Sequence, residues 1–448
     1  MPTNPLGPTG LLAQSMTLPA GSQSLAMGGN KVRAQGMDGR KKSAGPGNWL
    51  GLSGTTSAEW AFRGAVDTQG NLILTGDRGG ALLIAKYSAN GERNWSGQIA
   101  GADTGGTLGF NSPGEGGVTT DGAGNVYLVT TGNAATTLET FKIDASGKIV
   151  WGRSYTAGTA AWAKDIAVGV SGSVYVLARS QGGGFGGNSV LVVKYSPAGV
   201  FQWSRNVDLI PAEGLTLDAS ENVYVLTYIP GGLLKLNSAG TLQWSVQRSG
   251  GTAPNQVQKI AVASSGETYV VGSHPSGSGA CALWAIDASG AARWSRGLGT
   301  DSSVWFGVVL SGSSVFCLGA TTQAGAGGAD ILLAEYDTSG ALKSQRTIGS
   351  AGNDYGYAIA DADINSLAIF GSTALGAGSG DVFIGRVPKS GLPGGQVGPY
   401  TLAAANLTAQ NLTTTFASAS PATQPLGSDA ASSLSLTSTV LTTAIYPL

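Results

Sequence analysis

Charged residues are scarce in this chain of 448 residues, at 11% against roughly 25% in an average soluble domain. There is one histidine, His274, so no histidine cluster can bind a metal and a Ser-His-Asp triad has a single candidate base. Two cysteines, Cys281 and Cys317, exclude a disulfide framework. We expect two free buried thiols, although one bridge stays open.

Other signals are missing too. The first residues lack a basic segment followed by an apolar run, so we expect no signal peptide. No stretch of 18 apolar residues occurs, so we expect no membrane insertion. The 25 basic and 26 acidic residues nearly balance, which argues against nucleic acid as a partner because its phosphates attract basic surfaces.

Glycine, by contrast, is abundant, and much of it belongs to a repeat. The string KYSANGERNW (86–95) returns as KIDASGKIVW (142–151), KYSPAGVFQW (194–203), KLNSAGTLQW (235–244) and AIDASGAARW (285–294). Weaker copies are EYDTSGALKS (335–344) and RVPKSGLPGG (386–395). The glycines that these copies share are Gly91, Gly147, Gly199, Gly240, Gly290, Gly340 and Gly391, spaced 56, 52, 41, 50, 50 and 51 residues apart. A period of about 50 residues is typical of propeller blades.

Each period contains four strand signals. In the second period these are GGVTTD (116–121), NVYLVTT (125–131), LETFKID (138–144) and KIVWGRSY (148–155). The second segment of each period is almost continuously apolar, which indicates a strand buried on both faces. Packing of one blade against the next explains such burial.

A tryptophan follows the shared glycine by four residues in most copies. The glycine suits a tight turn that needs positive φ. We expect the tryptophans to dock neighbouring blades rather than to line a binding surface, because their register is fixed. These residues are Trp49, Trp95, Trp151, Trp203, Trp244 and Trp294.

The seventh period lacks a fourth strand, since LPGG follows Gly391 and proline and glycine weaken strands. KKSAGPGNW (41–49) supplies the missing motif, with Gly45 four residues before Trp49. We therefore predict an all-β, seven-bladed propeller over residues 41–396, with four antiparallel strands per blade. NWLGLSG (48–54) closes blade seven and removes the open edges.

The pattern DYGYAIAD…GST…GDVFIGR (354–386) resembles the seven-bladed bacterial propeller repeat called SBBP, and 116–151 and 165–203 match its second half. The resemblance covers about 350 residues and implies architecture, not function. The chain is also distantly similar to pyrroloquinoline-quinone-type repeats. The vicinal cysteines of many such dehydrogenases are absent, because Cys281 and Cys317 lie 36 positions apart.

Candidate chemistry is sparse. His274 lies in a loop segment without a nucleophile elbow. Asp361 and Asp363 are close in sequence, but no acid recurs on the inner strands at a position that marks a catalytic centre. Asp103, Asp301 and Asp354 recur where one blade passes to the next, which favours turn hydrogen bonding. We expect no cofactor, no metal and no enzymatic activity.

Two segments fall outside the predicted ring: an N-terminal arm (1–40) and a Ser/Thr/Ala/Leu-rich tail (397–448) with one charged residue, Asp429. The tail's low charge is not typical of disorder. We expect the tail to be an assembly segment, and both terminal segments to contact other protein chains. The leading hypothesis is a structural or binding protein of a bacteriophage virion, such as a tail, tail-fibre or capsid-associated protein. The alternatives are an extracellular or bacterial surface propeller that binds glycan or protein, and a quinoprotein-like or glycan-active enzyme.

Overall fold

The protein is described by a computed structural model, in which the chain divides into two compact units, Met1–Ser43 and Ala44–Leu448. The residues described are 26–27, 30–31, 47–54, 59–78, 81–100, 116–132, 135–181, 188–208, 212–228, 232–249, 257–274, 280–299, 302–375, 381–412, 415–419, 421–424, 428–431, 435–438 and 442–448. In the first unit, β1 (Ala26–Met27) pairs antiparallel with β2 (Asn30–Lys31). Among the described residues no helix is long and apolar enough to cross a membrane.

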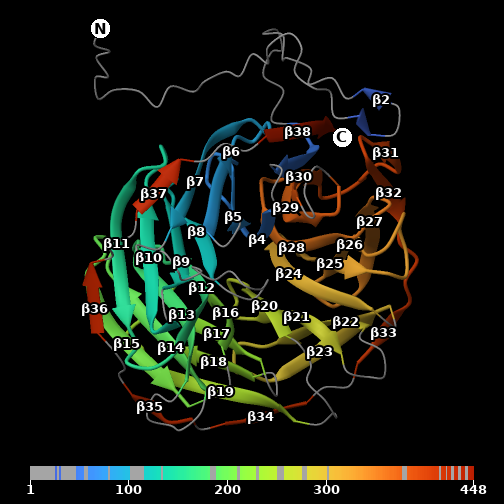
Figure 1. Cartoon of the computed structure of the whole chain (residues 1–448). Helices are drawn as coiled ribbons and strands as arrows, with labels where there is room; N and C mark the ends of the chain where they lie inside the picture. The colour runs from blue at the N-terminus through green and yellow to red at the C-terminus, as the bar shows by residue number, and fades with distance from the viewer. Residues whose placement is uncertain are drawn as a thin grey trace, which may run out of the picture. The chain divides into compact units, whose positions relative to one another are not determined.

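The second unit is built from seven antiparallel sheets, here called blades one to seven and numbered along the chain (Figure 1). Blade one comprises β4 (Glu59–Val66), β5 (Leu72–Arg78), β6 (Ala81–Tyr87) and β7 (Arg93–Ala100). Blade two comprises β8 (Gly117–Thr120), β9 (Val126–Thr131), β10 (Thr137–Ile143) and β11 (Ile149–Thr156). Blade three comprises β12 (Ala161–Val168), β13 (Val174–Gln181), β14 (Asn188–Tyr195) and β15 (Phe201–Val207).

The remaining blades follow the same meander. Blade four comprises β16 (Ala212–Leu217), β17 (Val223–Thr227), β18 (Gly232–Leu236) and β19 (Leu242–Ser249). Blade five comprises β20 (Val257–Val262), β21 (Thr268–His274), β22 (Ala280–Ile286) and β23 (Ala292–Leu298). Blade six comprises β24 (Ser303–Ser311), β25 (Ser314–Thr321), β26 (Asp330–Asp337) and β27 (Leu342–Gly349). Blade seven takes β28 (Asp354–Asp361), β29 (Ser366–Thr373) and β30 (Asp381–Pro388) from the end of the repeats and β3 (Trp49–Gly54) from their beginning.

These blades form a ring, because each inner strand packs against the inner strand of the next blade and β28 packs against β4. The predicted closure is confirmed: β3 pairs antiparallel with β30, with Trp49 opposite Arg386 and Leu52 opposite Phe383. The second strands β9, β17 and β29 are buried along their whole length, as their continuous apolar sequences predicted.

Neighbouring blades are joined by a contact between a tryptophan and a glycine. The indole Nε1 of Trp95 donates to the carbonyl of Ala145 at 3.1 Å, in the turn that holds Gly147 of the next blade. A methyl group on Gly147 would lie 3.0 Å from the Trp95 ring, and one on Gly199 would lie 2.8 Å from Trp151. The turn glycine therefore provides both its positive φ, 93° at Gly147, and the space into which the indole fits.

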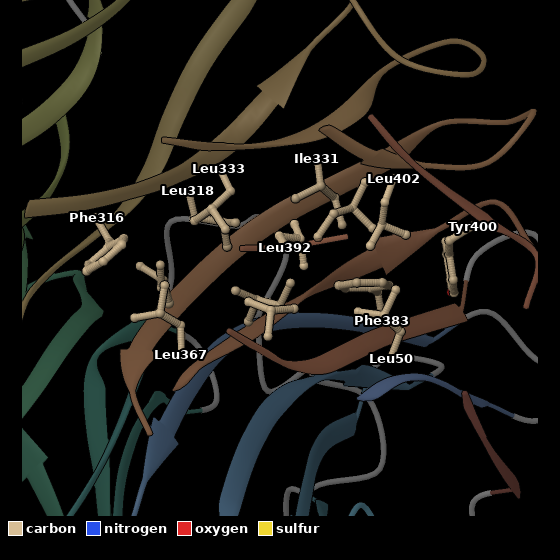
Figure 2. Close-up of a cluster of buried hydrophobic side chains, with 14 residues drawn as sticks. Leu50, Phe316, Leu318, Ile331, Leu333, Leu367, Phe383, Leu392, Tyr400 and Leu402 are labelled. Atoms are coloured by element: carbon tan, nitrogen blue, oxygen red, sulfur yellow. The ribbon is translucent and has the colours of Figure 1, made fainter. Parts of the chain in front are cut away.

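The same contact recurs around the ring, but not between blades six and seven. The other pairs are Trp49 with Gly91, Trp203 with Gly240, Trp244 with Gly290 and Trp294 with Gly340. Blade six carries Ser344 instead of tryptophan, and nothing lies within 4 Å of a methyl group on Gly391. That junction is filled by apolar side chains such as Leu392, Tyr400 and Leu402 (Figure 2). Gly45, the glycine predicted to precede Trp49, lies outside the described residues.

The C-terminal segment forms a belt around the ring, defined here as β31 to β38, which adds two antiparallel strands to blade six and one to each of the other blades. The hairpin of β31 (Gly395–Val397) and β32 (Tyr400–Ala404) extends blade six through β27. The next strands extend blades five to one: β33 (Ala409–Asn411), β34 (Thr415–Ser418), β35 (Thr423–Gln424), β36 (Ser428–Ala431) and β37 (Ser435–Ser438). The last strand, β38 (Thr442–Pro447), pairs with β3 on blade seven. Figure 1 shows these red segments following the outside of the ring.

Side chains next to the tryptophans hold the belt. Ser245, which follows Trp244, donates its hydroxyl to the carbonyl of Ala419 at 2.7 Å. Ser295, which follows Trp294, donates to the carbonyl of Leu412 at 2.7 Å. The tail expected to rest on another chain thus pairs with the outer strands of its own ring, and contacts of the tails with other chains stay a prediction.

We predict that Gly91→Ala destabilises the protein more than Gly391→Ala. Both positions have positive φ, 86° and 68°, so an alanine costs about 1–2 kcal/mol of backbone strain at each. Only at Gly91 does the added methyl group collide, at 2.9 Å from Ile445 of β38 and 3.1 Å from Trp49. Overpacking adds about 1–3 kcal/mol there. Equal free energies of unfolding for the two variants in urea would contradict the docking role of this contact.

We also predict that removal of residues 408–448 lowers the unfolding temperature and promotes association. The deletion retains β32 on blade six and exposes the outer edges of the other six blades, and unpaired edges recruit strands from other molecules. Each lost backbone hydrogen bond contributes about 0.5–1.5 kcal/mol. A deletion of 439–448, which exposes blade seven alone, is the matched comparison. Calorimetry and light scattering should rank the two deletions in that order, and unchanged unfolding would contradict a stabilising belt.

Candidate functional site

A cavity of about 210 Å³ lies in the central channel, and all seven inner strands line it. Polar side chains come from five of them, as Arg63 of β4, Thr119 of β8, Asp165 of β12, Thr216 of β16 and Lys259 of β20. In a chain with so few charges, three charged groups in one buried cavity are unusual. The channel is therefore the candidate functional site.

Bulges aim the inner strands into this channel. In six of the seven, an extra residue interrupts the pairing with the second strand, and a bulge bends the strand and redirects its side chains. The bulge residues are Phe62, Lys164, Glu213, Gln258, Phe306 and Tyr357. The next position is equivalent in all seven blades by its pairing and holds Arg63, Gly117, Asp165, Gly214, Lys259, Gly307 and Ala358. At this position blades one, three and five carry charged residues, and the other four blades carry glycine or alanine. The small residues leave space in the channel for the charged side chains.

Asp165 connects three consecutive blades. Its Oδ2 lies 2.6 Å from Nζ of Lys259 on blade five and accepts the backbone N–H of Leu215 on blade four at 3.0 Å. Its Oδ1 accepts the N–H of Ile166 at 3.0 Å. The carboxylate is nearly buried, and it fixes the ammonium group of Lys259 in the channel.

At the bulge position, blades three to five carry polar side chains. Nζ of Lys164 lies 3.5 Å from Oε1 of Glu213 on the next blade, and both side chains are largely buried. Arg179 of β13 stacks on Trp162 at 4.1 Å beside this pair. We call Lys164, Glu213, Gln258 and Arg179 the polar wall.

Blades six, seven and one carry aromatic side chains at the same position. The ring of Tyr357 lies 5.1 Å from that of Phe306 and 5.7 Å from that of Phe62, both edge to face. Tyr355 stacks on Tyr357 at 5.9 Å. These four side chains are called the aromatic wall, so the channel mouth has one polar half and one aromatic half.

The surroundings raise the pKa of the Glu213 carboxyl and lower the pKa of the Lys259 amine. Burial raises the pKa of Glu213, although Lys164 and Arg63 oppose the rise. Burial lowers the pKa of Lys259, and Asp165 opposes this effect while Arg63 adds to it. A carboxylic acid that keeps its proton longer and an amine that loses its proton sooner are the groups that general acid–base catalysis uses.

Residues proposed from sequence lie elsewhere. Asp361 binds Nζ of Lys389 at 2.6 Å and Asp363 binds Arg386, so each has its own cation and the two do not form a catalytic pair. Asp354 accepts the N–H and the hydroxyl of Ser350, both at 2.7 Å, in the expected turn role. His274 ends β21, opposite Ala280. Asp103 and Asp301 lie outside the described residues.

The sequence did not reveal this cluster. Asp165 and Glu213 lie on inner strands at adjacent register positions, and the expectation that no acid there marks a catalytic centre stays a prediction. Aligning the first strands by their pairing positions would have found them. Cys281 and Cys317 are both free and buried, as expected. Among the described residues, no three His, Cys, Asp or Glu side chains gather as metal ligands.

No protein-family model matches the chain, and no curated protein matches its sequence. Similar solved structures include a streptogramin B lyase, at 10% identity and a TM-score of 0.45, covering 75% of this chain and 97% of that one. Another is virginiamycin B lyase from Staphylococcus aureus, at 13% identity and a TM-score of 0.43, covering 61% and 94%. A puromycin hydrolase has 13% identity and a TM-score of 0.33, covering 70% and 59%. Likeness at this level concerns the propeller fold.

These structures correct the functional expectation. The similar propellers include lyases and a hydrolase, and nothing among them points to a virion. The hypothesis of a virion component and the expectation that this protein has no enzymatic activity are both contradicted by these findings.

We predict that Glu213 makes stability fall with rising pH. Its pKa is raised in the folded state, so above the ordinary value of about 4.3 the folded protein holds more proton there than the unfolded chain. The free energy of unfolding then decreases as pH rises through the window up to the raised pKa, by at most about 1.4 kcal/mol per pH unit. Glu213→Gln should remove this fall in urea titrations from pH 4 to 8, whereas the exposed-site control Glu92→Gln should retain it. A retained fall in Glu213→Gln contradicts the assignment.

Proposed function

We propose that the protein is an enzyme that binds a small molecule at the mouth of its central channel and transfers protons on it, in a hydrolysis or an elimination. The observation that carries this proposal is a cluster of charged residues from blades one, three, four and five: Arg63, Asp165 and Lys259 line the cavity, and the ion pair of Lys164 and Glu213 lies beside them, close enough for Glu213 to act on Arg63 and Lys259. Buried charge is costly, and the ring does not need it at Arg63, Asp165 and Lys259, since the equivalent positions of the other four blades hold glycine or alanine.

A structural role explains part of this cluster. Asp165 joins three blades through hydrogen bonds and an ion pair, which stabilises the ring locally. Glu213 differs, because its described contact is a single long ion pair with Lys164 and it sits at a bulge. Glu213 therefore contributes little to the packing of the ring, and this favours a role in catalysis.

The roles follow from the electrostatics. Lys259 acts in its neutral form: the amine, held by Asp165, accepts a proton from a water molecule or a substrate carbon and becomes an ammonium ion paired with that carboxylate. Glu213 donates a proton to the leaving atom. Arg63 stabilises negative charge that develops between them. Each proton transfer of this kind contributes about 10²–10⁴-fold to a rate.

We also propose that the chain is a divergent member of the SBBP repeat group. Its Asx turns support this placement: Oδ1 of Asp121 accepts the N–H groups of Ala123 and Asn125, and Asp67 binds Gln69 and Asn71 in the same way. Membership concerns the architecture and adds no chemistry.

The activity is tested by incubating the protein with chromogenic esters, amides, lactones and a small-molecule extract and following consumption by mass spectrometry. We predict turnover of at least one compound and a loss of 100-fold or more in Glu213→Gln and in Lys259→Met. The control Glu92→Gln, in the exposed turn between β6 and β7, should retain full turnover. No turnover across the panel, or turnover that survives in both site variants, contradicts the proposal.

A further inference from the structure

We infer that the substrate is an amphipathic anion whose flat apolar part lies on the aromatic wall while its anionic group faces the cations of the polar wall. The inference rests on the proposed function, because it assigns a substrate class to the same site. It starts from the division of the channel mouth into two unlike halves.

The aromatic wall combines packing with exposed ring surface. Phe62 and Tyr357 belong to a buried apolar cluster between blades. Phe306 and Tyr355 are only half-buried, and Tyr357 also lines the cavity. Ring faces and edges of this kind bind flat apolar groups.

The opposite half carries an excess of positive charge. Lys164, Arg179 and Lys259 stand against two carboxylates, Asp165 and Glu213. Within the described part of the chain, the buried Nε–H of Arg179 donates to no acceptor. An anionic group on the ligand would balance the charge and offers the acceptor that this donor lacks.

The cavity limits the size of the ligand. Its volume of about 210 Å³ is below the range of about 300–1,000 Å³ that is typical of drug-sized ligands. The site therefore suits a small acid with one ring rather than a polymer. Such a ligand would place its ring near Tyr357, which lines the cavity, and direct its anion toward Lys164 and Arg179, which lie outside the cavity lining.

The test is binding of three matched probes, 3-phenylpropionate, 3-phenylpropylamine and butyrate, followed by calorimetry and ligand-observed NMR. We predict a millimolar or tighter Kd for 3-phenylpropionate and at least tenfold weaker binding of both the amine and the ringless acid. Arg179→Gln should reduce discrimination against the amine, and Phe306→Ala should reduce discrimination against butyrate. Val150→Ala, on the exposed outer strand β11, is the control and should change neither ratio.

The outcomes separate the two proposals. Equal binding of the acid and the amine, no detectable binding of the acid, or ratios that the wall variants leave unchanged overturn the inference. Turnover lost in Glu213→Gln on a cationic or ringless substrate would uphold the proposed enzyme and overturn the substrate class. Binding of 3-phenylpropionate with both variant effects, but without turnover of any compound, would uphold the substrate class and count against the enzyme.

Discussion

The contact of a tryptophan ring with the turn glycine of the next blade is the constraint on which the ring depends. It fixes the spacing of blades at six of seven junctions, and it leaves no room for a side chain at the glycine. The indole also donates a hydrogen bond into the same turn, so distance and orientation are set together. The junction without this contact is the one where the chain leaves the ring, and there the apolar side chains of the C-terminal segment fill the gap.

A regular scaffold supports an irregular site. The outer and middle strands repeat the same sequence features around the ring, while the inner strands differ from blade to blade at the bulge and at the position after it. Of these side chains, Arg63, Asp165, Lys259 and Tyr357 line the channel cavity, and Phe62 and Tyr357 also pack in an apolar cluster between blades. Charged and aromatic residues thus occupy the same two positions on different blades of one ring.

The propeller was predictable because a turn glycine recurs in every period and a tryptophan follows it in most of them. The strand that begins at Trp49 also replaces the one missing after Gly391. The belt was not, since its strands are two to six residues long and pair with edges distant in sequence. The serines that follow Trp244 and Trp294, which bind the belt, were a usable signal. The site escaped notice because a bulge decides which residue of an inner strand faces the channel, and a linear count of alternating residues does not reveal a bulge. Glu213 is itself the bulge residue of its strand, whereas Asp165 follows the bulge residue of its strand by one position.

The path of the belt has a mechanical consequence. Its strands run from blade six backwards to blade one and end on blade seven, each attached by its own short ladder. A pulling force on the C-terminus would break the hydrogen bonds of these ladders one strand at a time, with β38 first and β32 last. The ladders would not carry the force together. The outer layer would detach in small successive steps, and the ring would keep its packing until β32 is reached, because Tyr400 and Leu402 of that strand fill the junction of blades six and seven.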